Sequence, residues 1–347
     1  MKNKILPTLL LLNAFLLHGQ NTKVIPEFPK EPQQLNLSDI AEKVSVVPLE
    51  INTGMVLDIF MTQEYIFTAS HNSIFQFNPS GKLIRRIDCG GTILNNITGD
   101  TIKKELYVPV NKELKVFDFS GNLKKTYKLE NRIDGCFFYK NILYIQSHKM
   151  IDTITINHDI SYLDLSTGKE FFLPVKISKK AENTLNGGSF IWFEKGAFFV
   201  QDNSLFFAFQ MTDNAFYQLQ KQEQKIEPVI NLIIQLSNQH EAATLKRINQ
   251  KIFIGKYLYV EYRIDDQSYL YMEDMKNGKT FHIKISYIKE NEGIRDDVFN
   301  TGKISRIRSL NQEGYIYFIN TRSEINGNSI GNIPLKDGSV VFILKTK

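Results

Sequence analysis

Hydrophobic and polar residues alternate with a period of two in the stretch 72–88, which reads NSIFQFNPSGKLIRRID. A two-residue period places successive side chains on opposite faces and is typical of a β-strand. Asn78-Pro79-Ser80-Gly81 interrupts the alternation. Because proline fixes its own φ and glycine accepts a positive φ, these four residues favour a tight turn. The stretch therefore predicts a β-hairpin, which needs further strands to be stable in water.

Similar hairpin patterns recur along the chain. Their turns centre on Gly81, Gly121, Gly168 and Gly278, at intervals of 40, 47 and 110 residues. The longest interval leaves room for one further copy, at 214–232. Repeats of about 40 residues, each forming one four-stranded sheet, are typical of β-propeller blades.

Six blades can be assigned on this pattern. They span 55–88, 93–129, 133–175, 189–232, 245–285 and 303–344. The sixth lacks an outer strand, whereas the strand predicted at 43–49 has no blade of its own. Placing that first strand in the last blade completes the sheet and removes free edges. The predicted fold class is therefore all-β, a six-bladed β-propeller closed by an N-terminal strand that completes the last blade.

The first 42 residues divide into two predicted segments before the propeller, which spans 43–347. Residues 1–20 have the parts of a secretory signal peptide, with a basic start at Lys2 and Lys4 and an apolar run too short to span a membrane. Residues 21–42 are rich in proline and have no strand pattern, so we expect an extended arm or linker. The mature protein is expected to be exported, periplasmic or at the cell surface, without an integral membrane segment.

Composition agrees with strands and excludes one class of partner. The 25 Phe and 15 Tyr favour β-structure. Removal of Lys2 and Lys4 from the 42 basic residues leaves 40 against 37 acidic residues, a net charge of +3. That charge is too small to indicate a nucleic-acid partner. Cys89 and Cys136 could pair in an oxidising compartment, but two separate buried thiols are the favoured interpretation.

No motif in the sequence predicts a metal, a cofactor or a catalytic residue. None of the mature histidines stands at zinc-ligand spacing from another histidine or a cysteine; they are His71, His148, His158, His240 and His282. The stretch 327–331, GNSIG, matches the G-x-S-x-G sequence pattern of a nucleophile elbow but not its structural context. That elbow needs a strand before the serine and a helix after it, whereas this setting is rich in turn residues.

Charged and aromatic residues near the starts of the inner strands are expected to surround the mouth of the central channel. There, charged groups would hold a polar ligand and an indole ring would stack on it. The candidate ligand-binding residues are Asp58, Asp134, Trp192, Arg247, Asp296, Asp297 and Arg306. In the alternative interpretation, Arg247 and Arg306 pair with the acids and stiffen the ring, while Asp296-Asp297 caps or forms a turn.

Four short motifs carry a family resemblance. They are Val47-Pro48-Leu49-Glu50, the turn region 77–87, the stretch 212–219 (TDNAFYQL) and Ile294-Arg295-Asp296-Asp297. With these motifs the chain resembles, over roughly 43–347, the NHL-like six-bladed propeller proteins exported by Bacteroidetes, a family largely without assigned function. The loop 89–92 (CGGT) lacks the basic, Gly- and Pro-rich character common there. The resemblance implies an exported propeller.

Two functions remain open from the sequence. The first is a binding or scaffolding module for a saccharide, a peptide or an envelope protein. The alternative is a glycan-active hydrolase or lyase with carboxylates at the mouth of the central channel. Propellers support both classes, so the fold does not decide. Two carboxyl groups roughly 5–10 Å apart in one pocket would favour a glycosidase, whereas dispersed, already paired charges would favour binding.

Overall fold

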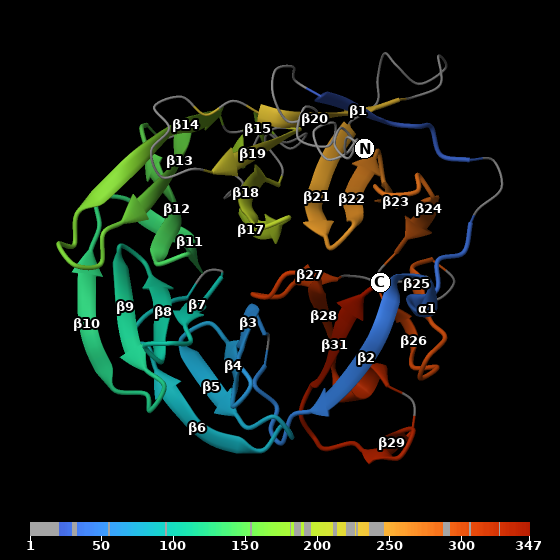
Figure 1. Cartoon of the computed structure of the whole chain (residues 1–347), viewed down its shortest axis with the longest axis horizontal. Helices are drawn as coiled ribbons and strands as arrows, with labels where there is room; N and C mark the ends of the chain where they lie inside the picture. The colour runs from blue at the N-terminus through green and yellow to red at the C-terminus, as the bar shows by residue number, and fades with distance from the viewer. Residues whose placement is uncertain are drawn as a thin grey trace, which may run out of the picture.

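Six β-sheets are arranged as blades around a central axis in the computed structural model of the protein (Figure 1). The strand that comes first within each of blades one to five lies nearest the axis, and the last lies at the rim (Figure 1). The structure describes residues 21–29, 33–54, 56–93, 96–152, 155–180, 182–183, 189–190, 196–210, 214–219, 226, 228–235, 246–286, 292–304, 307–325 and 327–347. The predicted six-bladed propeller is thus confirmed.

The first three blades are antiparallel meanders of four strands each. Blade one consists of β3 (Asp58–Met61), β4 (Ile66–Ala69), β5 (Ser73–Phe77) and β6 (Leu83–Asp88). Blade two consists of β7 (Thr98–Asp100), β8 (Glu105–Val110), β9 (Glu113–Asp118) and β10 (Leu123–Lys128). Blade three consists of β11 (Arg132–Tyr139), β12 (Ile142–Met150), β13 (Thr155–Leu163) and β14 (Glu170–Lys180).

Blades four and five continue the ring. Blade four consists of β17 (Gly196–Gln201), β18 (Ser204–Phe209), β19 (Ala215–Leu219) and β20 (Pro228–Ile234). Blade five consists of β21 (Lys246–Ile254), β22 (Tyr257–Ile264), β23 (Gln267–Asp274) and β24 (Thr280–Ile285). Because each middle strand packs between two neighbouring sheets, its burial is nearly continuous, as in β22, whereas the outer strand β6 is mostly exposed.

Blade six joins the two ends of the propeller. It consists of β27 (Arg308–Ser309), β28 (Tyr315–Asn320), β31 (Val340–Thr346) and β2 (Ala41–Pro48), in that order from the axis outward. β2 pairs with β31 antiparallel, with Val44 opposite Leu344. The predicted closure of the last blade by an N-terminal strand is therefore confirmed, and it leaves β31 paired on both sides.

The turn between β5 and β6 of blade one packs against the closing strand β2. Gly81 has φ +78°, and a Cβ built on it would lie 2.1 Å from the carbonyl oxygen of Pro48, at the end of β2. The amide of Glu50 donates to the carbonyl of Gly81 at 2.9 Å. Only glycine satisfies both the backbone conformation and this close approach. The turn predicted from the sequence thus also holds blade one against the end of β2, where the ring closes.

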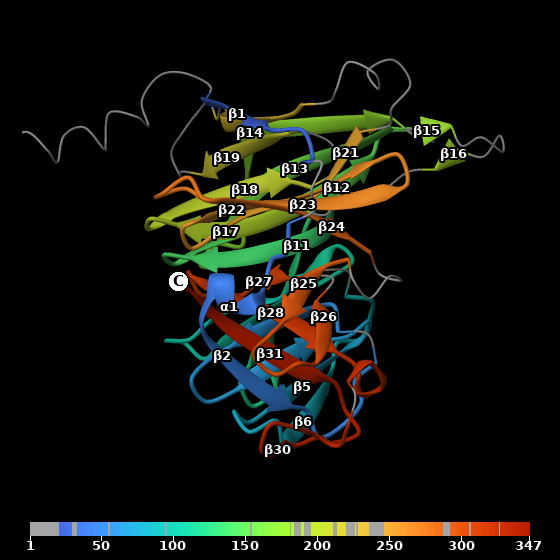
Figure 2. The ribbon, with the colours of Figure 1, turned by 90° about the vertical axis from the view of Figure 1, so that its right-hand side faces the viewer.

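Residues 21–29 and 33–40, which we call the strap, lie along the outer rim of blades four to six (Figures 1 and 2). Its first part forms β1 (Asn21–Ile25), which pairs in parallel with β20 and makes blade four five-stranded. Its last part forms α1 (Leu37–Ile40), a single turn of helix that leads directly into β2. No strand pattern predicted β1, because its polar residues precede its apolar ones without alternation.

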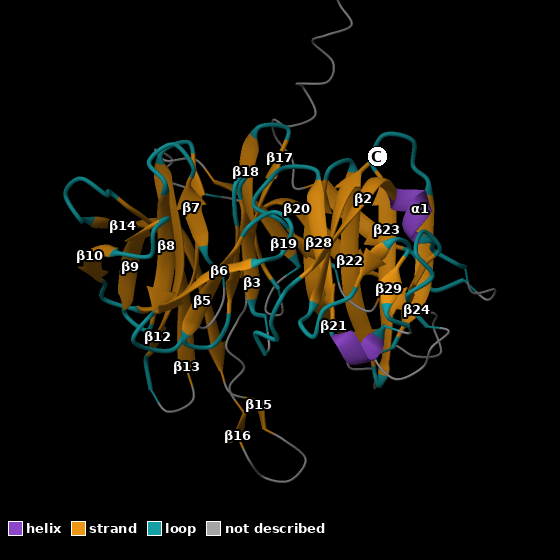
Figure 3. Cartoon of the chain, turned by 90° about the horizontal axis from the view of Figure 1, so that it is seen from below, coloured by secondary structure: helices purple, strands orange, loops and turns teal. Residues whose placement is uncertain are grey.

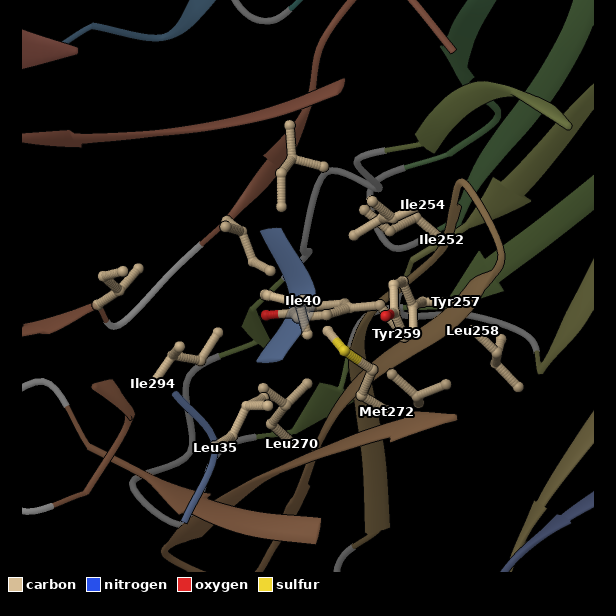
Figure 4. Packing of buried hydrophobic residues seen from close by; sticks show 14 of the residues in the cluster. Leu35, Ile40, Ile252, Ile254, Tyr257, Leu258, Tyr259, Leu270, Met272 and Ile294 are labelled. Atoms are coloured by element: carbon tan, nitrogen blue, oxygen red, sulfur yellow. The ribbon is translucent and has the colours of Figure 1, made fainter. Parts of the chain in front are cut away.

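The strap is held by the largest hydrophobic core cluster. Leu35 and Ile40 are buried in one cluster with Tyr259, Leu270 and Met272 of blade five (Figure 4). Burying an aliphatic side chain of this size contributes about 2 kcal/mol. The hydrophobic side chains of the strap therefore add materially to the packing that joins blades five and six.

Three short hairpins and one 3₁₀ turn complete the described structure. The hairpins are β15 (Glu182–Asn183) with β16 (Ser189–Phe190), β25 (Ile294–Asp296) with β26 (Gly302–Ile304), and β29 (Ser329–Ile330) with β30 (Ile333–Pro334). β15 and β16 stand out from one face of the ring (Figure 3). The 3₁₀ turn is η2 (Arg322–Glu324). Ser329 is exposed in its hairpin, with no helix after it, as the loop interpretation of the GNSIG stretch predicts.

Candidate functional site

A polar side chain crosses every seam between neighbouring blades. In each case a side-chain group of one blade hydrogen-bonds the main chain of the next. The six contacts, in ring order, are Asp58 to Ile97 at 2.9 Å, Thr98 to Phe138 at 3.1 Å, Tyr139 to Asn203 at 2.5 Å, Gln210 to Lys251 at 2.6 Å, Gln250 to Ile307 at 3.3 Å and Asn311 to Met61 at 3.0 Å. Polar residues close to the axis therefore serve the closure of the ring.

Asp58 belongs to this set of seam contacts. It starts β3 and is 9% exposed. One carboxylate oxygen accepts the amide of Ile97, and the other accepts the hydroxyl of Tyr317 at 3.0 Å. Burial raises the pKa of the Tyr317 hydroxyl, and the nearby Asp58 carboxylate raises it further. One carboxylate thus joins blades six, one and two.

Asp134 lies inside blade three rather than across a seam. It sits at an irregularity in the pairing of β11 with β12 and is 1% exposed. Its carboxylate contacts Nδ1 of His148 at 2.6 Å and lies 4.0 Å from Nδ1 of His158. Burial raises the pKa of this carboxyl, and the hydrogen bond to His148 opposes the rise.

The buried Asp134–His148–His158 cluster is the group that the sequence did not reveal. The histidines stand opposite each other on β12 and β13, with ring centroids 6.0 Å apart. They are ten residues apart in the chain, so only the register of this hairpin brings them together. The available signal for this cluster was an aspartate at the third position of one strand with one histidine on each of the next two strands.

Asp296 ends β25 and Asp297 follows it, in a hairpin that lies away from the axis and meets the strap (Figure 1). Asp296 is 1% exposed and accepts hydrogen bonds from the amides of Phe299 and Thr301 at 2.9 and 3.1 Å. Asp297 accepts the amide of Ser38 at 2.9 Å and also its hydroxyl. Partial desolvation opposes the effect, but these bonds from Ser38 lower the pKa of Asp297. The two carboxylates thus shape a turn and hold α1.

The remaining candidate residues are described only in part or not at all. Trp192 and Arg306 lie outside the described residues. Arg247 is described as backbone in β21, where it pairs with Arg263. The structure therefore places the four candidate aspartates in three separate hydrogen-bonded networks: the seam at Asp58, the interior of blade three, and the rim beside the strap.

A shallow recess of about 10 Å³ opens near the ends of the inner strands of blades three to five. Phe137, Phe199 and Phe253 line it, together with the segment 309–316 between and around β27 and β28. These phenylalanines occupy the later halves of β11, β17 and β21, whereas Asp134 and Arg247 occupy the first halves. The recess therefore lies near the last residues of the inner strands, whereas Asp134 and Arg247 lie near the first residues.

The rim of the recess is polar. Gln312 and Glu313 are exposed there, and the Glu313 carboxylate accepts the amide of Asp202 at 2.8 Å, which joins loops of blades six and four. Among the described residues that line the recess, Glu313 supplies the single carboxylate. Phe199 and Phe253 are themselves buried, so the surface open to a ligand consists of the half-buried Phe137 and the polar groups at the edge. A glycosidase pair of carboxyl groups is not formed by these lining residues.

The two cysteines are separate and buried, as the sequence interpretation favours. Cys89 and Cys136 are free and buried. Burial raises the pKa of Cys89 to about 12, and burial also raises the pKa of Cys136. Within the part of the chain that the structure describes, no group of three or more His, Cys, Asp or Glu residues is arranged to hold a metal ion. No helix of the described residues has the length and apolarity to cross a bilayer.

Comparison with known proteins identifies the fold and no family. No family model matches the chain, and a search of curated proteins found no match. Among solved structures, the chain is similar to a "putative exported protein" from Bacteroides fragilis, with a TM-score of 0.64, 11% identity and coverage of 94% of this chain and 100% of that one. At this identity the likeness establishes the shared propeller fold alone.

Two further solved structures are similar at a lower level. A structural genomics protein of unknown function from Bacteroides thetaiotaomicron matches with a TM-score of 0.49 and 9% identity, covering 88% of this chain and 76% of that one. BamB from Moraxella catarrhalis matches with a TM-score of 0.41 and 10% identity, covering 88% of this chain and 99% of that one.

Proposed function

We propose that the protein is an exported binding or scaffolding module, whose ligand is a saccharide, a peptide or an envelope protein. The observation that supports this function most directly is the distribution of its carboxylates. The candidate aspartates are engaged in three separate structural networks, and the recess has one carboxylate among its described lining residues. Dispersed, hydrogen-bonded charges favour a binding role over acid–base hydrolysis of glycans.

Export is part of the same proposal. Residues 1–20 have the composition of a signal peptide. The Bacteroides fragilis protein with the same fold is itself described as exported. We propose on these grounds that the chain is an NHL-like propeller of the kind exported by Bacteroidetes and that it acts in the periplasm or at the cell surface.

The recess between blades three and six is the binding site we propose for a small ligand. The half-buried ring of Phe137 provides an apolar surface for a sugar ring or an apolar side chain, and Gln312 and Glu313 provide polar contacts at the edge. The candidate residues Trp192, Arg247 and Arg306 remain proposed ligand-binding residues.

A thermal-shift screen tests the proposal directly. Neutral and acidic oligosaccharides and short peptides are added to the full chain, and we expect at least one to raise the melting temperature. Gln312→Ala, at the recess, should remove that rise, whereas Glu64→Gln, an exposed change in blade one, should keep it. Release of shortened glycans during the incubation would instead support a hydrolase or lyase. The binding proposal fails if no compound shifts the melting temperature and no envelope protein is captured by the full chain.

A further inference from the structure

The outer strands of blades one and two carry an excess of positive charge. Residues 82–88 contain three basic residues and one acidic residue, and residues 123–128 contain three basic residues and no acidic residue. The two segments therefore hold an excess of five positive charges, which equals the formal net charge of the whole chain, +5. Positive charge is thus concentrated on β6, β10 and the residue that precedes β6.

Most of these cations have no carboxylate to neutralise them. Lys124 is paired with Glu105 at 2.5 Å. The other five are exposed and form no ion pair within the described part of the chain. Two of them hydrogen-bond neutral oxygens, of Ser120 and Ser73, so their charge is not compensated. The five are Lys82, Arg85, Arg86, Lys125 and Lys128.

The two outer strands are parts of one surface. Arg85 of β6 donates to the carbonyl of Ser120, in the turn that leads into β10, and a Cβ built on Gly121 would lie 3.1 Å from the side chain of Ile87. Among the described strands, none pairs with the outer edge of β6 or of β10. The strap follows the rim of blades four to six, on the other side of the ring (Figure 1). We call Lys82, β6 and β10 the basic rim.

Two exposed aliphatic side chains lie among these cations. Ile84 of β6 is 41% exposed, and Leu123 of β10 is 54% exposed. Each directly precedes a basic residue in the chain, Arg85 and Lys124. At a membrane surface, basic side chains attract anionic headgroups, while exposed aliphatic side chains enter the boundary between headgroups and acyl chains. An acidic polymer in water would use the charges but leave both aliphatic groups in contact with solvent.

We propose that the basic rim docks the protein on the surface of a membrane that contains anionic phospholipids. The uncompensated cations supply the attraction, and Ile84 and Leu123 supply apolar groups that only a lipid surface would bury. Basic residues on exposed edge strands also prevent sheets from pairing with each other, and that role alone requires no lipid. The basic rim is separate from the recess, so this inference goes beyond the function proposed above.

Sedimentation with lipid vesicles tests the proposal. The chain from Asn21 onward contains every described residue, and it is used because the apolar run in 1–20 would itself bind lipid. We expect it to sediment with vesicles of phosphatidylcholine mixed with phosphatidylglycerol, and to stay in solution with phosphatidylcholine alone. Raising the salt from about 0.1 M to about 1 M shortens the Debye length from about 10 Å to about 3 Å and should release most of it. Equal binding to both kinds of vesicle, or to neither, overturns the proposal.

Substitutions show whether the basic rim makes the contact. Lys82→Glu, Lys125→Glu and Lys128→Glu together should weaken binding to the mixed vesicles by at least about tenfold, since each cation near an anionic surface adds to the attraction. The double change Ile84→Ser and Leu123→Ser keeps every charge and should weaken binding several-fold, because the apolar contact is lost. Unweakened binding in both variants would place the contact elsewhere and refute the proposal.

The matched control is Lys43→Glu with Lys276→Glu and Lys347→Glu. These lysines are exposed and lie outside the basic rim, and the net charge changes by the same amount. We expect binding to stay within about twofold of the unmodified chain, because distant surface charges are screened. An equal loss in this control would show that net charge governs the binding, which overturns the proposal. Binding of polyglutamate without binding of vesicles would identify an acidic polymer as the occupant and overturns it too.

Discussion

The hydroxyl of Tyr317 donates a hydrogen bond of 3.0 Å to the carboxylate of Asp58, which links the last blade to the first. The two residues are 259 positions apart in the sequence. Both are buried, and the second oxygen of the same carboxylate holds the main chain of blade two. This contact and the pairing of β2 with β31 close the ring at the same seam.

Tyr317→Phe removes the hydrogen bond and keeps the ring. We expect the free energy of unfolding in urea to fall by about 1–3 kcal/mol, because the buried carboxylate loses a partner. Tyr315→Phe in the same strand is the control, since Tyr315 is only half-buried, and it should change stability by less than about 0.5 kcal/mol. Equal effects of the two changes would contradict a role for the Asp58 contact.

Gly81→Ala should be more destabilising than Gly278→Ala. Both glycines have a positive φ, +78° and +71°, so both changes cost about 1 kcal/mol in backbone strain. A Cβ at Gly81 would meet the carbonyl of Pro48, whereas one at Gly278 meets nothing within 4 Å. We expect at least about 1 kcal/mol of further loss at Gly81 from this clash. Urea unfolding of both variants measures the difference, and similar losses would refute the packing of this turn on β2.

Stability should fall on acidification because of His282. Burial lowers the pKa of His282 from 6.5 to about 4. The folded state therefore binds fewer protons than the unfolded state between these values, and stability rises with pH in that window. The contribution, roughly 3 kcal/mol, is complete above pH 6.5 and is lost as the pH falls towards 4. Unfolding free energies measured from pH 4 to 7 test the slope.

His282→Gln is the matched change for that experiment. It removes the titrating ring, so the dependence on pH between 4 and 6.5 should become flatter even if the variant is less stable overall. His71→Gln alters an exposed histidine of blade one and should leave the slope as it is. An unchanged slope in His282→Gln would show that another group is responsible.

Asp134→Asn tests the buried cluster in blade three. The change keeps the shape but removes the charge that contacts His148 at 2.6 Å. We expect a loss of about 2 kcal/mol in the free energy of unfolding, as for hydrogen bonds to charged groups. Asp266→Asn, at a fully exposed turn, should have almost no effect. If Asp134→Asn leaves the free energy of unfolding unchanged, the cluster does not stabilise the blade.

The two thiols should be unreactive in the native protein. Both are buried, and burial raises the pKa of each, so little thiolate is present at neutral pH. A thiol reagent should label neither cysteine in native buffer and both in concentrated urea. Rapid labelling of either thiol in native buffer would contradict its burial.

The sequence by itself determined the repeated hairpins and the number of blades. The alternation in 72–88 and the turn at Asn78–Gly81 depend on neighbours within a few residues, and the structure has β5, the turn and β6 at those positions. An incomplete last blade and an extra first strand predicted the pairing of β2 with β31, because every strand needs a partner for its main-chain groups. Counting strands is enough for that inference.

Only the tertiary structure decided which distant side chains meet. His148 and His158 face each other because of the register of β12 with β13, and a shift of one residue would turn one of them to the other face. Asp297 meets Ser38 at the rim, and Lys23 meets Glu273, because the strap crosses blades that are formed some 250 residues later in the chain. Local periodicity has no information about such contacts, since they depend on how complete sheets pack.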